Sequence, residues 1–350
     1  MLTSIVVRTK DEAPRLRLML ASLARQTLQG EVVVVNDGST DATPQVLDEA
    51  RARLDLTVVT HATAQGRSAA SNAGARAARG DVVVFFDGDT LAAPDALERH
   101  VAMHASAPRG EVRIGRGEKF HFRGTRFFKD PEAGTPRPGE EARVARLSEA
   151  ELGRMKVTRA MVEEDFDALA RRAEVGVYPG AGPRRLQELE LDALRRHPDC
   201  TVLWAAACGS NLSVRRDAFL AAGGYDDALD CNEHRELALR LCERGARMTL
   251  VEGARGYHLT HRAGWRDPLR ESGWEAVFWR AHPILAVKIL PVFWACIDTA
   301  PNVPNHARLA SLPELEAAAR GARDVDWDEV RRRLGLPDLP LPRPATADLA

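Results

Sequence analysis

Residues 82–90, VVVFFDGDT, decide the fold of this chain and place a candidate site within it. Residues 82–86 are all β-branched or aromatic, which predicts a strand that is covered on both faces, as in parallel sheets. Asp87 and Asp89 follow directly at the carboxyl end of this strand. In open α/β sheets ligands bind at that edge, so the two carboxylates are candidates for a site. Taken alone, the stretch is equally compatible with a strand that ends in an Asp-Gly turn.

The first 115 residues alternate between strand-like and helix-like segments. The apolar runs predict strands at 4–7, 31–35, 56–60, 82–86 and 112–115. The segments between them predict helices at about 13–28, 43–54, 68–78 and 94–104, with Pro94 in the first turn of the last helix. Such βαβ alternation requires right-handed crossovers, so we predict an α/β fold with a doubly wound, mainly parallel, Rossmann-like sheet.

Changes in composition divide the rest of the chain. Glycine, proline and charged residues are frequent in 118–200, which predicts a helical and loop insertion. Strand-like segments return at 201–207 and 248–251, with a helix through Leu237 and Leu241 between them. Helices are expected further on, and the chain ends in a proline-rich tail. The expected units are 1–117, 118–200, 201–262, 263–335 and 336–350.

Composition and charge exclude several classes of protein. The 350 residues are 45% hydrophobic, enough for a large core, and the formal charge of −1 gives no bulk attraction to nucleic acid. The five cysteines lack the close pairs of a zinc site or a disulfide framework, which fits a reducing compartment. The amino terminus, MLTSIVVRTK, lacks the basic and apolar regions of a signal peptide. We therefore expect a cytoplasmic protein without a nucleic-acid partner.

The longest apolar run is ILAVKILPVFWACI, residues 284–297. It is too short to span a bilayer and is interrupted by Lys288 and Pro291, so a core or docking helix is expected. Three aromatic residues lie just upstream: Trp274, Phe278 and Trp279. The alternative is that 274–297 contacts a partner or a membrane surface, which would place the protein on the cytoplasmic side of a membrane.

Five segments carry a resemblance to a known family: VVVVNDGSTDAT (32–43), QGRSAASNAGARAARGDVVVFFDGDT (65–90), NLSVRRDAFLAAGGYDD (211–227), NEHRELALRL (232–241) and GYHLTH (256–261). In this order they resemble the inverting-type family 2 glycosyltransferases with the GT-A fold, over roughly two thirds of the chain. The resemblance implies transfer of a sugar from a nucleotide-diphosphate donor to an acceptor hydroxyl. It also implies an acceptor lobe, which we expect from 118–200 and from the region after His258.

The resemblance gives the two carboxylates at 87 and 89 a role. Departure of a nucleoside diphosphate leaves growing negative charge, which a divalent cation such as Mn²⁺ or Mg²⁺ stabilises. In the family an acid-x-acid motif binds this cation; Asp89 matches its metal-binding acid, and Asp87 matches the acid that faces the ribose and the metal. His258 matches a C-terminal histidine that several members use as a further ligand. Because His261 is close by, a purely structural role for either histidine is the alternative.

The resemblance also indicates nucleotide-binding residues. Asp37, in NDGST, is similar to the acid that accepts a hydrogen bond from the base, although Asn36 replaces the acid that usually precedes it. Thr9 and Arg8, at the end of the first strand, are expected to frame the base pocket. Arg67 is expected to offer charge to the nucleotide. The alternatives are a helix-capping or turn role for Asp37 and a solvated helix-cap role for Arg67.

Residues 232–241 depart from the family pattern at the general base. Family members commonly carry a Glu-Asp pair at the start of this helix, and its Asp accepts the proton of the acceptor hydroxyl; here the pair is Glu233 and His234. Either His234 takes the proton, which the ordinary pKa of histidine permits, or Glu233 does. Alternatively the product retains the anomeric configuration of the donor. An ordinary helix start capped by Asn232 or Asp230 also accounts for these residue types.

Two other functions compete with sugar transfer. A sugar-phosphate nucleotidylyltransferase shares the broad architecture but needs a glycine-rich loop after the first strand, where this chain reads RTKDEAPRL. A catalytically silent nucleotide-sugar-binding protein is suggested by the replacement at His234. The acids at 87 and 89 and His258 argue against it, because a protein released from catalysis need not keep a metal site.

Overall fold

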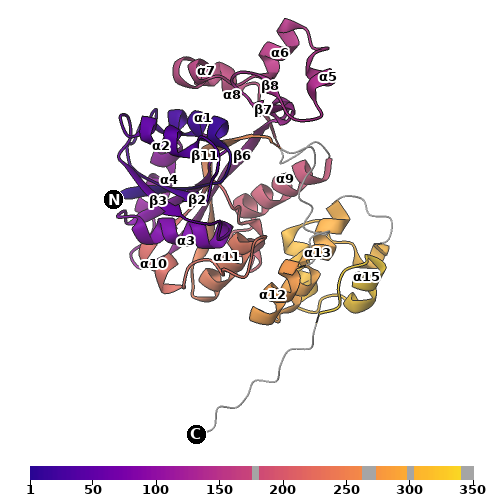
Figure 1. Cartoon of the computed structure of the whole chain (residues 1–350). Coiled ribbons are helices and arrows are strands. Elements are labelled where there is room, and N and C mark those ends of the chain that lie inside the picture. The colour runs from indigo at the N-terminus through magenta and orange to yellow at the C-terminus, as the bar shows by residue number, and fades with distance from the viewer. Residues whose placement is uncertain (176–180, 262–272, 298–302, 340–350) are drawn as a thin grey trace.

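A mixed, mostly parallel sheet forms the centre of the computed structural model, which describes residues 1–175, 181–261, 273–297 and 303–339 (Figure 1). Nine strands of the described chain run in the order β3-β2-β1-β4-β10-β6-β11-β5, with β9 paired to β6. Their bounds are β1 (Thr3–Thr9), β2 (Glu31–Asp37), β3 (Leu56–His61), β4 (Val82–Asp87), β5 (Thr90–Ala92), β6 (Arg113–Phe122), β9 (Glu174–Val175), β10 (Leu212–Arg215) and β11 (Arg247–Leu259). The predicted α/β class and mainly parallel sheet are confirmed.

Strand β1 lies between β2 and β4 and runs parallel to both, with Val6 opposite Val33 and Phe85. The next strand, β10, is antiparallel to β4 and places Leu212 opposite Phe85. All four side chains are at most 2% exposed, which explains why the strands read as unbroken apolar runs. The carboxyl ends of β1, β2 and β4 meet at one edge of the sheet.

Helices cover both faces of the parallel strands. The helices of this half are α1 (Ala13–Leu23), α2 (Thr43–Ala50), α3 (Arg67–Ala77) and α4 (Ala96–Ala105). Helix α3 packs on one face so closely that a Cβ atom on Gly74 would lie 2.4 Å from Cγ1 of Val6. Buried side chains of α1 and α2 share a cluster with Ile5 and Val7 of the opposite face. This is the doubly wound arrangement that the sequence predicts.

The predicted helix ends are wrong in three places; one is α2, which was expected to reach residue 54 and ends at Ala50. Helix α1 ends at Leu23, and α4 begins at Ala96, so Pro94 precedes the helix instead of forming its first turn. The loop after α1 and the loop before α4 bind each other: the Gln26 side chain donates to the Ala93 carbonyl, and the Thr27 amide donates to the Pro94 carbonyl, both at 2.8 Å. This tertiary pairing replaces the helical hydrogen bonds that local propensity favours.

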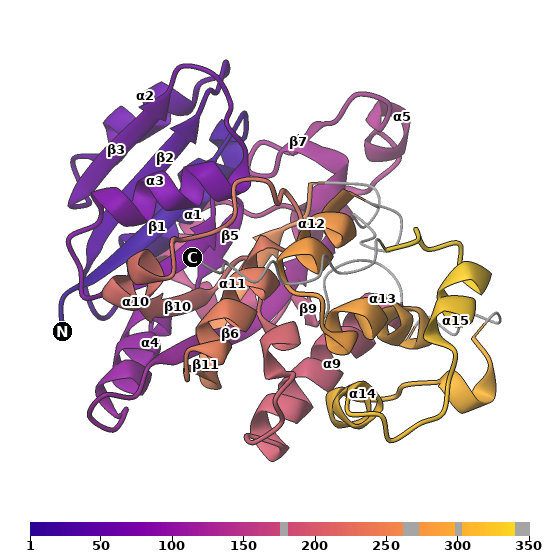
Figure 2. The same cartoon turned by 90° about the horizontal axis from the view of Figure 1, so that it is seen from below.

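The 118–200 region contains helices, and β6 runs across the boundary expected at residue 117. Its elements are η1 (Arg123–Phe127), β7 (Phe128–Asp130), β8 (Thr135–Pro136), α5 (Glu141–Val144), α6 (Glu149–Met155), α7 (Arg159–Glu164), α8 (Phe166–Ala170) and α9 (Ala181–Arg196). Helices α5 to α8 gather at one end of the molecule, whereas α9 lies beside the C-terminal helices (Figures 1 and 2). The 118–200 region is therefore divided into two parts, α5 to α8 and α9, which lie in different places on the molecule.

The strand predicted at 201–207 is wrong: these residues contain the 3₁₀ turn η2 (Leu203–Ala206). Trp204 is 1% exposed, and the carbonyl groups of Ala205 and Ala206 accept hydrogen bonds from Arg235 and Arg116. A short apolar run marks burial but does not distinguish a strand from a buried turn. The neighbouring elements are α10 (Arg216–Ala221), α11 (Glu233–Glu243) and β11, which is longer than the strand predicted at 248–251.

The C-terminal elements are α12 (Gly273–Ala281), α13 (Leu285–Ile297), η3 (Asn305–Ala307), α14 (Leu312–Ala319) and α15 (Trp327–Arg333). Their buried side chains belong to the same core cluster as Trp204 and Leu237. Trp274, Phe278 and Trp279, the aromatic residues considered for membrane contact, are at most 8% exposed and face the protein interior. Within the described ranges, no helix has the length and apolarity needed to cross a membrane. Most of the expected tail, 340–350, lies outside the described residues.

Candidate functional site

A cavity of about 570 Å³ opens at the carboxyl edge of the sheet. Among its lining residues are all eight that the sequence singled out: Thr9, Asp37, Arg67, Asp87, Asp89, Glu233, His234 and His258. They come from β1, β2 and β4, from the turn between β4 and β5, and from α3, α11 and β11, so the fold brings together segments that are far apart in the sequence. A cavity of this size suits a ligand of nucleotide-sugar dimensions.

Asp37 lies at the end of β2, where its carboxylate holds the loop that leads into α3. The Gln65 amide and His61 Nδ1 donate to Oδ1 at 2.8 and 2.7 Å, and the Gly66 amide donates to Oδ2 at 3.0 Å. Burial opposes ionisation, but these hydrogen bonds outweigh it and lower the pKa of Asp37. The following helix, α2, begins after Ala42 without a cap from Asp37, so the helix-capping alternative does not apply.

Arg8, at the end of β1, joins two of the candidate carboxylates. Its Nε donates to Asp87 Oδ1 at 2.7 Å, and its Nη1 donates to Glu233 Oε1 at 3.0 Å. Burial works against the charge of Arg8, but Asp87 and Glu233 outweigh it and raise the pKa. The backbone amide of Asp87 also donates to Ser210 Oγ at 3.1 Å, so this acid is fixed on the Arg8 side of the cavity.

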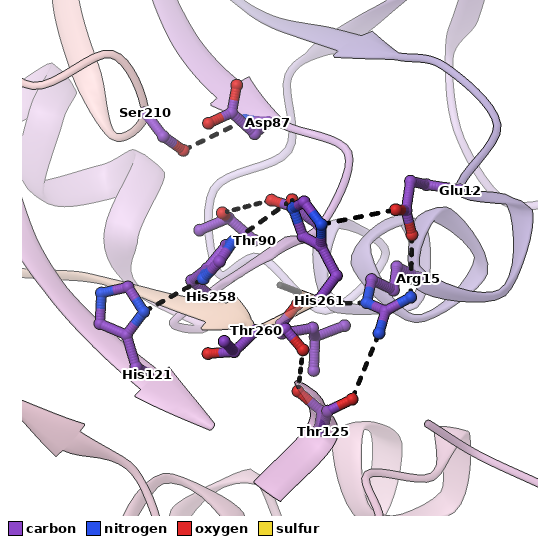
Figure 3. Close-up of polar contacts among 12 residues, drawn as sticks. Glu12, Arg15, Asp87, Thr90, His121, Thr125, Ser210, His258, Thr260 and His261 are labelled. Carbon is purple, nitrogen blue, oxygen red and sulfur yellow. Dashed lines mark hydrogen bonds and ion pairs between the residues drawn. The ribbon is translucent and has the colours of Figure 1, made fainter. Parts of the chain in front are cut away.

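Asp89 lies in a different cluster, with two histidines. One carboxylate oxygen of Asp89 and one ring nitrogen from each of His258 and His261 lie within 4.8 Å of one another. His258 Nε2 is 3.3 Å and His261 Nε2 is 2.9 Å from Asp89 Oδ2. Burial opposes ionisation of Asp89, but the two histidines outweigh it and hold its pKa well below its usual range. Asp87 lies apart from this cluster, beside Ser210 (Figure 3).

Two further residues contact the histidines from outside the cluster. His121 Nδ1 is 3.1 Å from His258 Nδ1, and Glu12 Oε1 is 3.7 Å from His261 Nδ1 (Figure 3). Sequence reasoning missed both, and it gave His261 no positive role. Parallel pairing of β6 and β11 places His121 directly opposite His258, a register that no local pattern reveals.

Glu233 and His234 begin α11 beside the Arg8 cluster. Asn232 occupies the N-cap position with φ 62° but makes no side-chain capping hydrogen bond. Burial opposes ionisation of Glu233, but His234 and Arg8 outweigh it and hold its pKa well below its usual range. Burial lowers the pKa of His234, and Glu233 opposes this only in part, so the imidazole is neutral near pH 7. His234 Nε2 accepts from Arg235 Nη1 at 3.0 Å, while Nδ1 lies 3.6 Å from Glu233 Oε2.

A buried ion-pair triad supports this end of the cavity. Glu190 of α9 binds Arg116 of β6 at 2.8 Å through one oxygen and Arg235 of α11 at 2.9 Å through the other. Arg116 and Glu190 are at most 4% exposed. Because Arg235 also donates to His234, the triad fixes the position of that imidazole relative to the sheet.

Comparison with known proteins agrees with the resemblance in the sequence. Residues 4–167 match the family model described as Glycosyl transferase family 2. Validoxylamine A glucosyltransferase of Streptomyces hygroscopicus subsp. jinggangensis (strain 5008) is 28% identical over 354 residues, which cover 97% of this chain and 73% of that protein. Putative glycosyltransferase EpsH of Bacillus subtilis (strain 168) is 36% identical over 97 residues, 27% of this chain and 28% of that protein.

Solved structures share the fold at low sequence identity. S. aureus TarS 1–349 in complex with UDP aligns with a TM-score of 0.51 and 17% identity, covering 86% of this chain and 71% of that one. The same protein in complex with UDP-GlcNAc aligns with a TM-score of 0.51 and 16% identity, covering 86% and 72%. At this level of identity, the likeness is evidence for a common architecture.

Proposed function

Because the chain belongs to glycosyl transferase family 2 and has the GT-A fold, we propose that it transfers a sugar from a nucleotide-diphosphate donor to an acceptor hydroxyl with the help of a divalent cation. One observation carries the proposal: a single cavity is lined by the Asp37 carboxylate at the end of β2 and by the cluster of Asp89, His258 and His261. The family relationship argues against the nucleotidylyltransferase alternative.

The cation would be held by Asp89, His258 and His261. The three ligand atoms are one carboxylate oxygen and two imidazole nitrogens, a donor set that suits a divalent metal of the first transition row. When bound, such a cation neutralises negative charge on the departing diphosphate. Asp87, which we also expected to face the metal, lies outside this group of three, and its Oδ1 accepts from Arg8 Nε at 2.7 Å.

The nucleotide would lie against the ends of β1 and β2. Thr9 Oγ1 is buried and has no hydrogen-bond partner within the described chain, although the residue lines the cavity. A polar atom left in this way favours a ligand that supplies the missing partner. We assign the base to the Asp37 side and the phosphates to the Arg67 side, where the first turn of α3 adds its amide groups.

We assign the proton of the acceptor hydroxyl to His234. Glu233 is held by Arg8 with a strongly lowered pKa, which makes it a weak base, whereas His234 is neutral and lines the cavity. Its Nε2 lone pair is directed to Arg235 in this structure. The acceptor hydroxyl would take the place of that guanidinium N–H, because hydrogen bonds in a free active site often rearrange when substrate binds.

The acceptor would approach from the α9 side of the cavity, where Leu186, Gln187 and Glu190 form part of the lining. These residues belong to the inserted region that we expected on the acceptor side. We keep a cytoplasmic location as a proposal, because the spacing of the five cysteines gives no disulfide framework.

A thermal-shift screen tests the proposal. UDP-, GDP- and dTDP-sugars are each added with Mn²⁺, and we expect one nucleotide series to raise the melting temperature. At a ligand concentration a hundredfold above Kd, the stabilisation is about 2.7 kcal/mol. The responding sugar nucleotide is then incubated with the enzyme, and release of nucleoside diphosphate is followed. A screen in which no nucleotide sugar stabilises the protein contradicts the proposal.

A further inference from the structure

The two histidines beside Asp89 have the same orientation although they are supported by different residues. Each directs Nε2 toward Asp89 Oδ2, at 3.3 Å from His258 and 2.9 Å from His261. Each directs Nδ1 away from Asp89, toward His121 for His258 and toward Glu12 for His261 (Figure 3). A neutral imidazole offers one lone pair for a metal, and the partner of its other nitrogen decides which nitrogen carries that lone pair.

On the His258 side, the contact between two Nδ1 atoms at 3.1 Å requires one of them to donate. With a cation bound to its Nε2 lone pair, His258 would carry its proton on Nδ1 and donate it in the hydrogen bond to His121, which would then accept. His121 is fully buried on β6, and β-sheet pairing holds it directly opposite His258. The sheet itself therefore fixes this supporting imidazole.

On the His261 side, the support is a carboxylate held by a buried arginine. Glu12 Oε2 accepts from Arg15 Nη1 at 2.8 Å. Arg15 is 3% exposed and is itself fixed, because it donates to the carbonyl groups of Phe128 at 2.8 Å and Leu259 at 3.2 Å. Glu12 lines the cavity, and its Oε1 lies 3.7 Å from His261 Nδ1. After a small movement, the carboxylate can accept a hydrogen bond from the Nδ1–H of that ring.

We propose that His121 and Glu12 are positioning residues that hold His258 and His261 with Nε2 toward the cation, and that the resulting site, with one carboxylate and two imidazoles, selects Mn²⁺ over Mg²⁺. This inference rests on the metal site of the proposed function. Imidazole nitrogen binds divalent ions of the first transition row, Mn²⁺ included, more strongly than it binds the harder Mg²⁺, which prefers oxygen. Asp87 is not part of this cluster of three ligand atoms, and its Oδ1 accepts from Arg8 Nε at 2.7 Å.

The test measures binding of Mn²⁺ alone to the full chain, by the loss of the free Mn²⁺ signal in electron paramagnetic resonance. We expect His121→Ala and Glu12→Ala each to weaken Mn²⁺ binding by about 10- to 100-fold, the usual effect of removing a partner of a metal ligand. His121→Asn should restore most of the affinity, because its Oδ1 accepts a hydrogen bond near the position of the imidazole Nδ1. His104→Asn removes another buried histidine, on α4 and away from the cluster, and should leave the affinity unchanged.

Competition with Mg²⁺ tests selectivity in the parent chain and needs no variant. We expect displacement of Mn²⁺ to require at least about a tenfold excess of Mg²⁺. Nitrogen couplings from two imidazoles should appear in the electron spin echo spectrum of the bound Mn²⁺. Equal competition by Mg²⁺, or unchanged Mn²⁺ affinity in a folded His121→Ala, overturns the inference. If instead the parent chain binds no Mn²⁺, or Asp89→Ala binds it as well as the parent, the metal site of the proposed function is itself wrong.

Discussion

At the scale of single residues, Arg8 determines what the carboxylates of the cavity can do. It binds Asp87 and Glu233, which lie 79 and 225 residues away in the sequence. An acid held in this way stays ionised and is a weak base, so the residue next to Glu233 becomes the better proton acceptor. Asp87 lies with Arg8, whereas Asp89 lies with the two histidines. The two acids of the DGD motif therefore have different surroundings, which the motif alone does not reveal.

Asp37 should contribute to nucleotide affinity. We expect Asp37→Ala to weaken binding of the free nucleoside diphosphate by about 1.5–3 kcal/mol, the usual loss for a hydrogen bond to a charged group. Because its pKa is lowered, the carboxylate stays ionised to below the ordinary Asp range, so affinity should hold down to mildly acidic pH. Isothermal titration calorimetry measures both effects.

The matched control for Asp37 is His61→Asn, which disturbs the same carboxylate at Oδ1 but leaves it in place. This variant should lower the favourable free energy of nucleotide binding by less than Asp37→Ala does, because the charged hydrogen bond to the carboxylate remains possible. If both variants weaken binding equally, Asp37 acts by holding the 65–66 loop and not by contacting the base.

His234 should set the acid limb of the pH–rate profile. A base must be neutral to accept a proton, so turnover falls as pH drops through the pKa of His234. Burial lowers that pKa from its ordinary value, so turnover should be nearly constant around neutral pH and fall only at lower pH. We expect His234→Asn to reduce kcat by about 10²–10⁴-fold and to remove this limb, with nucleotide affinity unchanged.

Glu233→Gln distinguishes the two assignments for the base. If the carboxylate accepts the proton, Glu233→Gln gives the large loss in kcat and His234→Asn gives a small one. Parental turnover in both variants would place the base elsewhere, and the anomeric configuration of the product, read by NMR, would then be the informative measurement.

The sequence indicated which candidate residues would lie together better than it indicated their partners. All eight candidates line one cavity, because the ends of parallel strands converge whatever the connecting loops do. The partners of these residues were not predictable in the same way. His121 contacts His258 across 137 residues of sequence, and the contact depends on the register of two strands.

At the scale of elements, α4 supports the sheet through two buried histidines. His100 Nδ1 lies 2.8 Å from Ser213 Oγ, and His100 Nε2 lies 2.8 Å from Asn211 Oδ1. His104 Nε2 also contacts Ser213 Oγ, at 2.9 Å. Burial lowers the pKa of His100 to about 4 and that of His104 to about 3. Both imidazoles are therefore neutral in the folded protein at neutral pH.

This burial should make the free energy of unfolding depend on pH. An unfolded histidine binds a proton near pH 6.5, whereas His100 resists protonation until about pH 4, so stability is full above 6.5 and falls as pH decreases between these values. The loss for His100 is of the order of 3 kcal/mol. Denaturant unfolding from pH 7 to 4 should show a shallower slope for His100→Asn.

His197→Asn is the control for this slope, because His197 is exposed. It should leave the pH dependence unchanged. A parental slope in His100→Asn would show that the acid sensitivity arises from other groups.

Element types were predicted more reliably than element ends. The buried runs of β1, β2 and β4 read directly as covered strands, because both faces of a parallel sheet exclude polar residues. Residues 201–207 have the same apolar character but form a buried turn whose carbonyl groups bind two arginines. The distinction depends on partners from β6 and α11, which no local window contains.

At the scale of the whole molecule, the C-terminal helices are joined to the catalytic half through α11. The Arg235 guanidinium lies 5.1 Å from the ring centre of Trp294, and Glu236 Oε1 lies 3.0 Å from His282 Nε2. Because Arg235 also contacts His234, packing in the C-terminal region bears on the site. The sequence predicted helices there but not this connection.

Trp294→Ala should therefore affect catalysis as well as stability. We expect it to lower the free energy of unfolding by about 3–5 kcal/mol, the usual cost of truncating a buried Trp. It should also reduce kcat when turnover is measured at temperatures well below the melting temperature of the variant, because Arg235 loses the ring against which it packs. Trp327 is similarly buried, at 6% exposed against 3%, and begins α15, which packs on α13. Trp327→Ala should lose stability with kcat retained; equal kcat losses in the two variants would contradict the connection.

Nucleotide binding in this cavity should depend on a cation at Asp89, and isothermal titration calorimetry measures that dependence. The nucleoside diphosphate selected by the thermal-shift screen is titrated into the full chain with Mn²⁺ and again with a chelator. We predict at least about tenfold tighter binding with Mn²⁺. Asp89→Ala should abolish that difference while keeping the parental melting temperature. A dissociation constant that is the same with chelator as with Mn²⁺, or a folded Asp89→Ala that retains the difference, would contradict the account.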